Sequence, residues 1–278
     1  MPEQDLAEAP APDLIYDFGM DLCQDTDFYL AKGFRVVAIE ANPSTCAMAV
    51  EKYTSAIESG QLIIVNKAIS ETGEPLVFHV CHTLSAWSTA DKRLRDRLVR
   101  QEGAIFEEVI VEGVSSAAIL AQYGVPYFAK IDIEGFDLIC LQGFHSAPSR
   151  PQFISTEVAL RTARQQLSCL TELGYRRFAL VGQAKAPLQK PPRPASEGRD
   201  VDYSFMHHAS GLFGRELQAE WTTAERVARR CEMIHWQGRA SQALYIVSRI
   251  RPLKSTCEWL RQRLLPLACD WYDIHATF

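Results

Sequence analysis

Carboxylates stand at the ends of predicted strands in this sequence, where they could act as acids or bases. Asp132 and Glu134, in the stretch KIDIEG, follow an apolar run and lie two residues apart. On a strand they would face the same side, and α/β folds bind their ligands at the carboxyl ends of parallel strands. Both are candidate catalytic residues, because a positioned carboxylate can accept the proton of a reacting hydroxyl. The alternative is structural: both could cap the helix that begins near Gly135, since carboxylates stabilise helix N-termini.

Three further side chains could contact a substrate or take its proton. Glu157, in STEV, ends the next predicted strand, and His207 and His208 are adjacent in an irregular segment. Adjacent histidines in such a segment are more often solvated surface residues than functional ones. His79 and His82 lie on another predicted strand, and we expect them to be structural because no third ligand follows at a recognisable spacing. The sequence therefore predicts no metal site.

A single glycine follows the first apolar run, in LIYDFGMDLC. Asp17, Gly19 and Asp21 form this turn, and Glu40 ends the second apolar run, RVVAIEA. An acidic residue about 20 positions beyond a glycine turn is placed to accept hydrogen bonds from ribose hydroxyls. A dinucleotide would need G-x-G-x-x-G, so a nicotinamide oxidoreductase is disfavoured. The carboxylates here would repel a pyrophosphate and attract the ammonium and sulfonium groups of S-adenosylmethionine.

These residues need a parallel sheet to bring them together, and the order of the elements predicts one. Short apolar runs alternate with helix-like stretches, which is typical of an α/β fold with a doubly wound, Rossmann-like, mostly parallel sheet. The strands are expected at residues 14–18, 35–41, 61–68, 127–133, 152–158 and 176–182. The helices between them are expected at residues 25–32, 43–56, 116–123, 136–142 and 160–173.

Two regions depart from this alternation. Two extra strands (75–82 and 107–114) flank a polar helix (91–101), which predicts an insertion between the third and fourth parallel strands. Residues 183–220 contain KAPLQKPPRP and no clear periodicity, as expected of a lid or substrate-binding loop. A helix, a strand and a leucine-rich helix are expected after it, at residues 222–232, 243–249 and 253–266. The chain is expected to form one domain over residues 1–278, with a flexible start at residues 1–12.

The composition limits the partners and the compartment of the protein. With 47% hydrophobic and 23% charged residues it is an ordinary globular sequence, and its net charge of -5 argues against nucleic-acid binding. The eight cysteines form no C-x-x-C pair, which predicts reduced thiols and no disulfide framework. Without a signal peptide or a membrane-spanning run, the protein is expected to be cytoplasmic and without a membrane partner. The leucine-rich helix could pack inward or against a second copy, so the oligomeric state stays open between a monomer and a homodimer.

Three stretches resemble the FkbM-type class I methyltransferases: IYDFGMDLCQDTDFYLAKGFRVVAIEANP, KIDIEGFD and WYDIHA. The resemblance runs from about residue 14 to the end. It implies a sheet with a last antiparallel strand, S-adenosylmethionine as the cofactor, and O-methylation of a hydroxyl on a small molecule or glycan. The cofactor site that we expect comprises Asp17, Gly19, Asp21, Cys23, Thr26, Glu40, Ala41, Asn42, Lys67, Ala68, Ser85 and Asp132.

Cys23 stands where the family usually has glycine. A cysteine fits there if its backbone φ is negative. If φ is positive, the residue costs on the order of 1–2 kcal/mol, which would weaken cofactor binding without abolishing it. The substitution therefore leaves a second function open, a non-catalytic cofactor- or ligand-binding module on the same fold.

Overall fold

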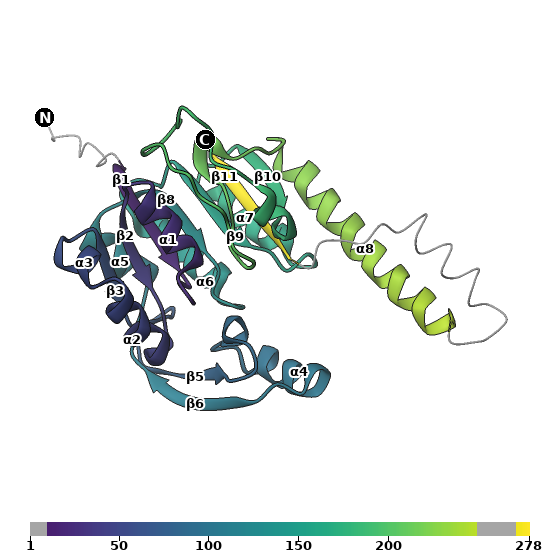
Figure 1. Cartoon of the computed structure of the whole chain (residues 1–278). Helices are drawn as coiled ribbons and strands as arrows, with labels where there is room; N and C mark the ends of the chain where they lie inside the picture. Colours follow the sequence, from purple (N-terminus) through teal and green to yellow (C-terminus); the bar gives the residue numbers. More distant parts are fainter. Residues whose placement is uncertain (1–9, 249–270) are drawn as a thin grey trace, which may run out of the picture.

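The computed structural model describes residues 10–248 and 271–278 of the chain (Figure 1). Its centre is a seven-stranded sheet in the order β10-β11-β9-β8-β1-β2-β3. The pairings from β9 to β3 are parallel, whereas β11 runs antiparallel to both of its neighbours. The strands are β1 (Ala11–Phe18), β2 (Arg35–Ile39), β3 (Leu62–Val65), β8 (Pro126–Ile131), β9 (Phe153–Glu157), β10 (Arg177–Gly182) and β11 (Tyr272–Thr277). This confirms the predicted doubly wound, mostly parallel sheet with a last antiparallel strand.

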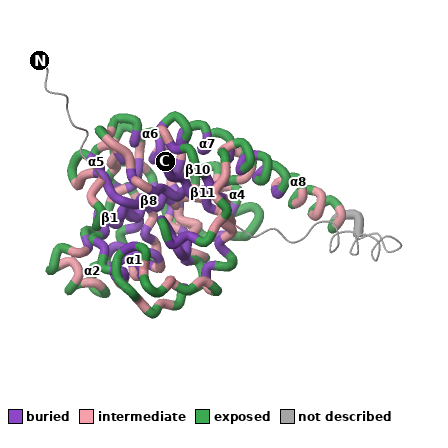
Figure 2. Tube along the Cα trace, turned by 90° about the horizontal axis from the view of Figure 1, so that it is seen from above, coloured by how far each residue is buried: buried purple, intermediate pink, exposed green. Residues whose placement is uncertain are grey.

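Helices cover both faces of the sheet. One face carries α5 (Ser116–Tyr123), α6 (Asp137–Gly143), α7 (Ala163–Glu172) and the first half of α8 (Ala224–Ser248). The other face carries α1 (Gln24–Ala31), α2 (Pro43–Lys52) and α3 (Thr54–Glu58). Neighbouring residues of β1 alternate between the two, because Tyr16 packs on the first face and Ile15 on the second. Every residue of β8 is buried, as expected for a central strand covered on both sides (Figure 2).

An insertion between β3 and β8 forms an arm beyond the carboxyl ends of the central strands (Figure 1). Its strands β5 (Leu76–Cys81) and β6 (Phe106–Val111) pair antiparallel, and η1 (Ser85–Trp87) and α4 (Lys92–Glu102) lie between them in the chain. Two short strands, β4 (Ala68–Ile69) and β7 (Gly113–Val114), pair in parallel where the arm leaves the body. The predicted extra strands and the polar helix between them are confirmed.

Residues 183–220 contain short 3-10 turns, η3 (Gln183–Leu188) and η4 (Gly214–Glu216), and otherwise follow an irregular path. The segment nevertheless buries aromatic side chains: the Phe213 ring stacks on Phe128 of β8 with the ring centroids 4.7 Å apart. A buried ion pair, with Lys32 Nζ 2.8 Å from Glu216 Oε1, ties the segment to the end of α1. Much of the segment therefore covers the sheet where another helix could have packed. Its predicted role as a lid or substrate loop stays a prediction.

The C-terminal part differs from the sequence-based expectation. The strand predicted at residues 243–249 is wrong, because residues 243–248 continue α8, which is 25 residues long and projects from the body (Figure 1). A short apolar run does not by itself distinguish a strand from a helix, and here it follows a helix without a break. The leucine-rich helix predicted at 253–266 lies outside the described residues. Within the two described ranges, no helix has the length and apolar character that a membrane span needs.

Smaller differences concern element boundaries. The helix predicted at 43–56 divides at Tyr53 into α2 and α3. The strand predicted at 61–68 ends at Val65, and β1 begins at Ala11, three residues before its predicted start. β1 ends at Phe18 as predicted, whereas β2 and β8 each end two residues earlier than predicted, at Ile39 and Ile131, so that Glu40 and Asp132 directly follow their strands.

Candidate active site

A cavity of about 490 Å³ lies between the carboxyl ends of the central strands and the arm. The loops after the strands contribute most of the predicted site residues to its wall, and the arm contributes Ser85, Trp87 and Arg97 on the other side. The predicted residues on the wall are Gly19, Asp21, Glu40, Ala41, Asn42, Lys67, Ala68, Ser85, Asp132, Glu134, Glu157 and His208. The cavity therefore joins the predicted cofactor and acceptor residues in one space.

The turn after β1 passes very close to the end of β8. Gly19 has φ +86°, and a Cβ at this position would lie 1.8 Å from the backbone oxygen of Asp132. The Gly19 amide donates to the carbonyl of Ile39, at the end of β2, over 2.9 Å. A side chain at residue 19 would push these strand ends apart, so glycine is required here for both its conformation and its size.

Cys23 has a left-handed backbone, with φ 66°. This is the strained alternative of the two that the sequence left open, with a cost on the order of 1–2 kcal/mol. The side chain is buried, and Cys23 lies outside the set of residues that line the cavity. Burial raises the pKa of its thiol to about 12, so the thiol stays protonated and is no nucleophile at neutral pH.

Glu40 connects the loops that follow β1 and β2. Its Oε2 accepts a hydrogen bond from the Asp21 amide (3.0 Å), and its Oε1 accepts one from the Asn42 amide (2.7 Å). Burial raises the pKa of Glu40 to about 7, although both hydrogen bonds favour the charged form. Each carboxylate oxygen has a second lone pair, so Glu40 can still accept hydrogen bonds from a ligand on the cavity wall.

Besides Cys23, two of the predicted cofactor residues, Asp17 and Thr26, are not part of the cavity wall. Asp17 is fully buried and its Oδ2 accepts a hydrogen bond from Thr26 Oγ1 at 2.6 Å. Asp17 shares the side of β1 that packs against α1, because it is two residues from Ile15. Any effect of Asp17 or Thr26 on a cofactor would therefore pass through neighbouring side chains.

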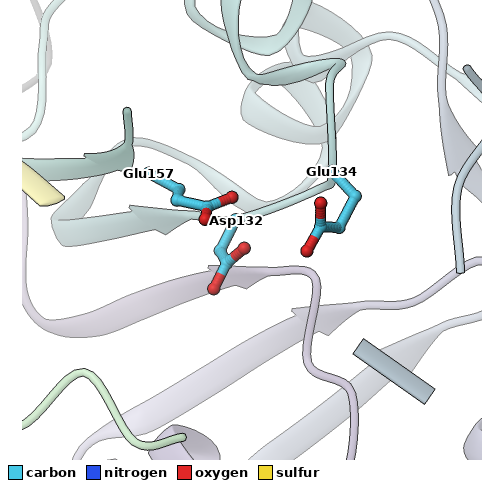
Figure 3. A group of neighbouring side chains, drawn as sticks. All are labelled: Asp132, Glu134 and Glu157. Atoms are coloured by element: carbon cyan, nitrogen blue, oxygen red, sulfur yellow. The ribbon is translucent and has the colours of Figure 1, made fainter. Parts of the chain in front are cut away.

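Three carboxylates converge at the ends of β8 and β9 (Figure 3). Asp132, Glu134 and Glu157 each offer an oxygen that lies within 4.8 Å of the others. Burial, and then the neighbouring carboxylates, raise the pKa values of Glu134 and Glu157 well above the usual range. These oxygens are suited by type to accept a proton or, as a group, to bind a hard divalent cation.

The structural alternative for Asp132 and Glu134 was helix capping, but α6 begins after Phe136 without a side-chain cap hydrogen bond, so neither residue caps it. The loop that carries them is held from the helix side. Asp137 Oδ1 accepts a hydrogen bond from the Ile133 amide, and Asp137 Oδ2 accepts one from the Gly135 amide, each with a length of 3.2 Å. The loop is also held by the arm, since Thr89 Oγ1 donates to the Glu134 carbonyl at 2.6 Å. Glu134 has φ 48°, a left-handed conformation that this contact helps to hold. The side chains of Asp132 and Glu134 are thus left to face the cavity.

The predicted histidines differ in their placement. His208 lines the cavity and stacks on Trp271, with ring centroids 5.5 Å apart, whereas His207 is not part of the wall. His79 is buried, with Nδ1 3.5 Å from Glu108 Oε1, and His82 is exposed and pairs with Glu107 at 3.1 Å. The latter two histidines therefore have separate partners on β6.

Sequence reasoning missed several residues of the wall, among them Asp25, Arg97, Lys130 and Trp271. Lys130 could have been predicted as a wall residue, because it precedes Asp132 by two positions in KIDIEG and so shares its side of the strand. Nothing in the sequence pointed to Arg97 and Trp271, since they reach the cavity from the arm and from the segment before β11. Their place depends on contacts between distant parts of the chain.

Comparisons with known proteins identify the family of the chain. The sequence matches the family model described as the methyltransferase FkbM domain over residues 11–177, which is more than half of the chain. Comparison with curated proteins finds none that matches. Among solved structures, the chain is similar to precorrin-6y C5,15-methyltransferase from Geobacter metallireducens GS-15, with 13% identity, a TM-score of 0.34, and coverage of 65% of this chain and 76% of that chain. A similarity at that level carries no argument about substrate or mechanism. The family match is the decisive finding, and the chain belongs to the methyltransferase FkbM domain family.

Proposed function

We propose that the protein transfers the methyl group of S-adenosylmethionine to a hydroxyl on a small molecule or glycan. The observation that supports this best is that one cavity joins Glu40, at the end of β2, to the carboxylates Asp132, Glu134 and Glu157. Glu40 can accept hydrogen bonds from ribose hydroxyls, and the three carboxylates at the ends of β8 and β9 can accept a proton. The cofactor, when bound, would supply an electrophilic methyl group on a sulfonium.

The charge of the wall supports a cationic cofactor. Asp21, Glu40 and Asp132 all line the cavity, and ionised carboxylates there would repel the pyrophosphate of a dinucleotide. The same charges would attract a sulfonium and an ammonium. Lys67 and Ala68 follow β3 and line the cavity, and the family resemblance makes them the candidates to contact the adenine. Ser85 lines the cavity from the arm and is the candidate to contact the carboxylate of the methionine moiety.

Methylation of a hydroxyl would form the oxygen–methyl bond, break the methyl–sulfur bond with S-adenosylhomocysteine as the leaving group, and release one proton from the acceptor oxygen. Glu134 and Glu157 are the candidates to take this proton on a carboxylate oxygen, and Asp132 is the candidate nearest the cofactor side. Their raised pKa values make Glu134 and Glu157 stronger bases than ordinary carboxylates once they are ionised. The walls of the cavity would align the acceptor and exclude water, and alignment alone can supply much of the rate.

Calorimetry with S-adenosylmethionine tests the cofactor assignment. We expect saturable binding, and the absence of heat at millimolar cofactor would overturn it. Mass spectrometry of a panel of hydroxylated small molecules and glycans then tests the reaction. We expect a mass gain of one methyl group on oxygen, and Glu134→Gln should bind the cofactor but transfer more slowly. Transfer to nitrogen acceptors alone would contradict O-methylation.

A non-catalytic binding module on the same fold is the second candidate. The left-handed backbone of Cys23 favours it, because strain at the cofactor turn is compatible with weakened binding. This function predicts weak or no cofactor binding and no methyl transfer to any acceptor of the panel. In either case the net charge of -5 and the acidic wall support a small acceptor over a nucleic acid.

A further inference from the structure

Lys130 is a buried lysine at the base of the cavity, and three carboxylates share its ammonium. The Nζ atom lies 3.3 Å from Asp25 Oδ2, 3.4 Å from Asp132 Oδ2 and 3.7 Å from Asp17 Oδ1. These carboxylates come from α1, from the loop after β8 and from β1. Burial by itself would lower the pKa of Lys130, but Asp132, Asp17 and Asp25 raise it well above its usual value. The lysine is therefore a fixed positive charge.

The strand register explains why these groups meet. Asp17 and Lys130 are direct neighbours on β1 and β8, and Asp132 follows on the same side of the chain, one step closer to the cavity. The side chains of Asp17 and Asp25 are 0% and 4% exposed, whereas that of Asp132 is 35% exposed. Asp17 is thus enclosed in the interior and Asp25 is almost fully buried although it reaches the cavity wall, whereas Asp132 stands on the wall with room to turn.

Other titratable groups also face this cluster. Tyr29 of α1 and Asp273 of β11 both interact with Lys130, and Asp273 is the register partner of Glu157. Asp17 Oδ1 accepts no hydrogen bond from the described residues, and its ion pair with the Lys130 ammonium, 3.7 Å away, is what offsets its charge. Without the ammonium, several buried carboxylates would repel one another, and Asp132 is the one with freedom to move away.

We propose that Lys130 is a positioning residue, which holds the Asp132 carboxylate in place on the cavity wall. This inference rests on the proposed function, because Asp132 is placed there to meet the cofactor. The alternative is that Lys130 only stabilises the fold, as a buried ion pair does. The two roles predict different effects of removing the lysine, because a positioning residue affects ligand affinity beyond any loss of stability.

The chain offers a matched control in Lys32. It is also buried and paired, with Glu216 at 2.8 Å, but it lies at the opposite end of α1 from Asp25 and outside the cavity wall. Lys130→Met and Lys32→Met each remove one buried ammonium and leave buried carboxylates unpaired. Both should lower the free energy of unfolding, and only the first should change ligand affinity.

The experiment is calorimetric titration of both variants and the wild type with S-adenosylmethionine and with S-adenosylhomocysteine, which lacks the sulfonium charge. For Lys130→Met we expect affinity for both compounds to fall about tenfold or more, the size expected when a charged hydrogen-bonding contact is lost. Lys32→Met should bind both compounds as the wild type does. Wild-type affinity in Lys130→Met, or tighter binding of S-adenosylmethionine alone, would overturn the proposal.

Should Lys130→Met fail to fold, the double variant Lys130→Met with Asp17→Asn can be titrated in its place. It removes one buried charge of each sign and so leaves fewer buried carboxylates unpaired. It should show the same loss for both compounds, and wild-type affinity there would overturn the inference. An equal loss in Lys32→Met would also overturn it, since the effect would then follow stability. A wild-type protein that binds neither compound overturns the proposed function and this inference with it, whereas the other outcomes leave the proposed function standing.

Discussion

Gly19 and Asp132 are in such close contact that no side chain fits between them: a Cβ on Gly19 would lie 1.8 Å from the Asp132 carbonyl oxygen. The contact joins the turn after β1 to the loop after β8. It therefore brings the predicted cofactor turn and the predicted catalytic carboxylates to the same cavity.

Gly19→Ala should disrupt this junction. We expect the free energy of unfolding to fall by at least about 2 kcal/mol, from the left-handed backbone together with the clash, and cofactor binding to be lost. Gly60→Ala is the matched control, because Gly60 has φ +74° but has no atom within 4 Å of an added Cβ. Urea denaturation of both variants measures the difference. Equal losses would mean that the close approach to Asp132 does not matter.

Cys23→Gly should relieve strain at the start of α1. We expect the protein to gain about 1 kcal/mol of stability and to bind the cofactor equally well or more tightly, since glycine adopts a positive φ freely. Cys23→Ala separates the two causes, because alanine removes the thiol and keeps the Cβ. A gain in Cys23→Ala of the same size, or a clear loss of affinity in Cys23→Gly, would show that the thiol and not the backbone matters.

Glu40→Ala should weaken S-adenosylmethionine binding by about 1–3 kcal/mol, the usual cost of losing hydrogen bonds to a charged group. Part of this loss comes from the Asp21 and Asn42 amides, which would lose their acceptor. Glu40→Gln keeps one acceptor oxygen and should give a smaller loss. Calorimetry measures both, and unchanged affinity in Glu40→Ala would contradict the placement of the ribose.

The buried carboxylates predict that stability falls as the pH rises. Burial raises the pKa of Asp17 to about 6, those of Glu40 and Asp137 to about 7, and that of Asp273 to about 8. Through these groups the folded state holds more protons than the unfolded state up to about pH 8, which makes the free energy of unfolding decrease with pH. His275 acts oppositely, because burial lowers its pKa to about 3 from the ordinary value of 6.5, and its effect is confined to more acidic solutions.

Urea denaturation between about pH 7 and pH 8 isolates the carboxylates, since His275 is mostly neutral there in both states. We expect a steady loss of stability across this range. Asp273→Asn should flatten the upper part of the curve, because it removes the group with the pKa of about 8. A flat wild-type profile would mean that these buried carboxylates ionise as they do in water.

Much of the sheet could be predicted from the sequence, because strand periodicity and helix capping are local properties. Asn42, for example, caps α2 through its side chain, and Pro43 begins that helix, as the local residues suggest. The positions of Gly19, Glu40 and Asp132 at strand ends followed from the apolar runs before them. The structure places these three residues on the wall of one cavity.

The differences have two physical causes. Residues 243–248 are helical although their apolar run allowed a strand, because the run continues a helix without a break. Asp17 faces Lys130 and Thr26 although its spacing allowed a place on the cavity wall, and this depends on the pairing of β1 with the distant strand β8.

The amino-acid sequence alone was enough to predict the alternation of strands and helices, the glycine turn after the first strand and the acidic character of the strand ends, because each depends on neighbouring residues. Three-dimensional packing was needed to establish the sign of φ at Cys23, the convergence of Glu134 with Glu157 and the closure of the cavity by the arm. Backbone strain and side-chain convergence are set by which strands and loops pack together, and that packing is not encoded in any single stretch of the chain.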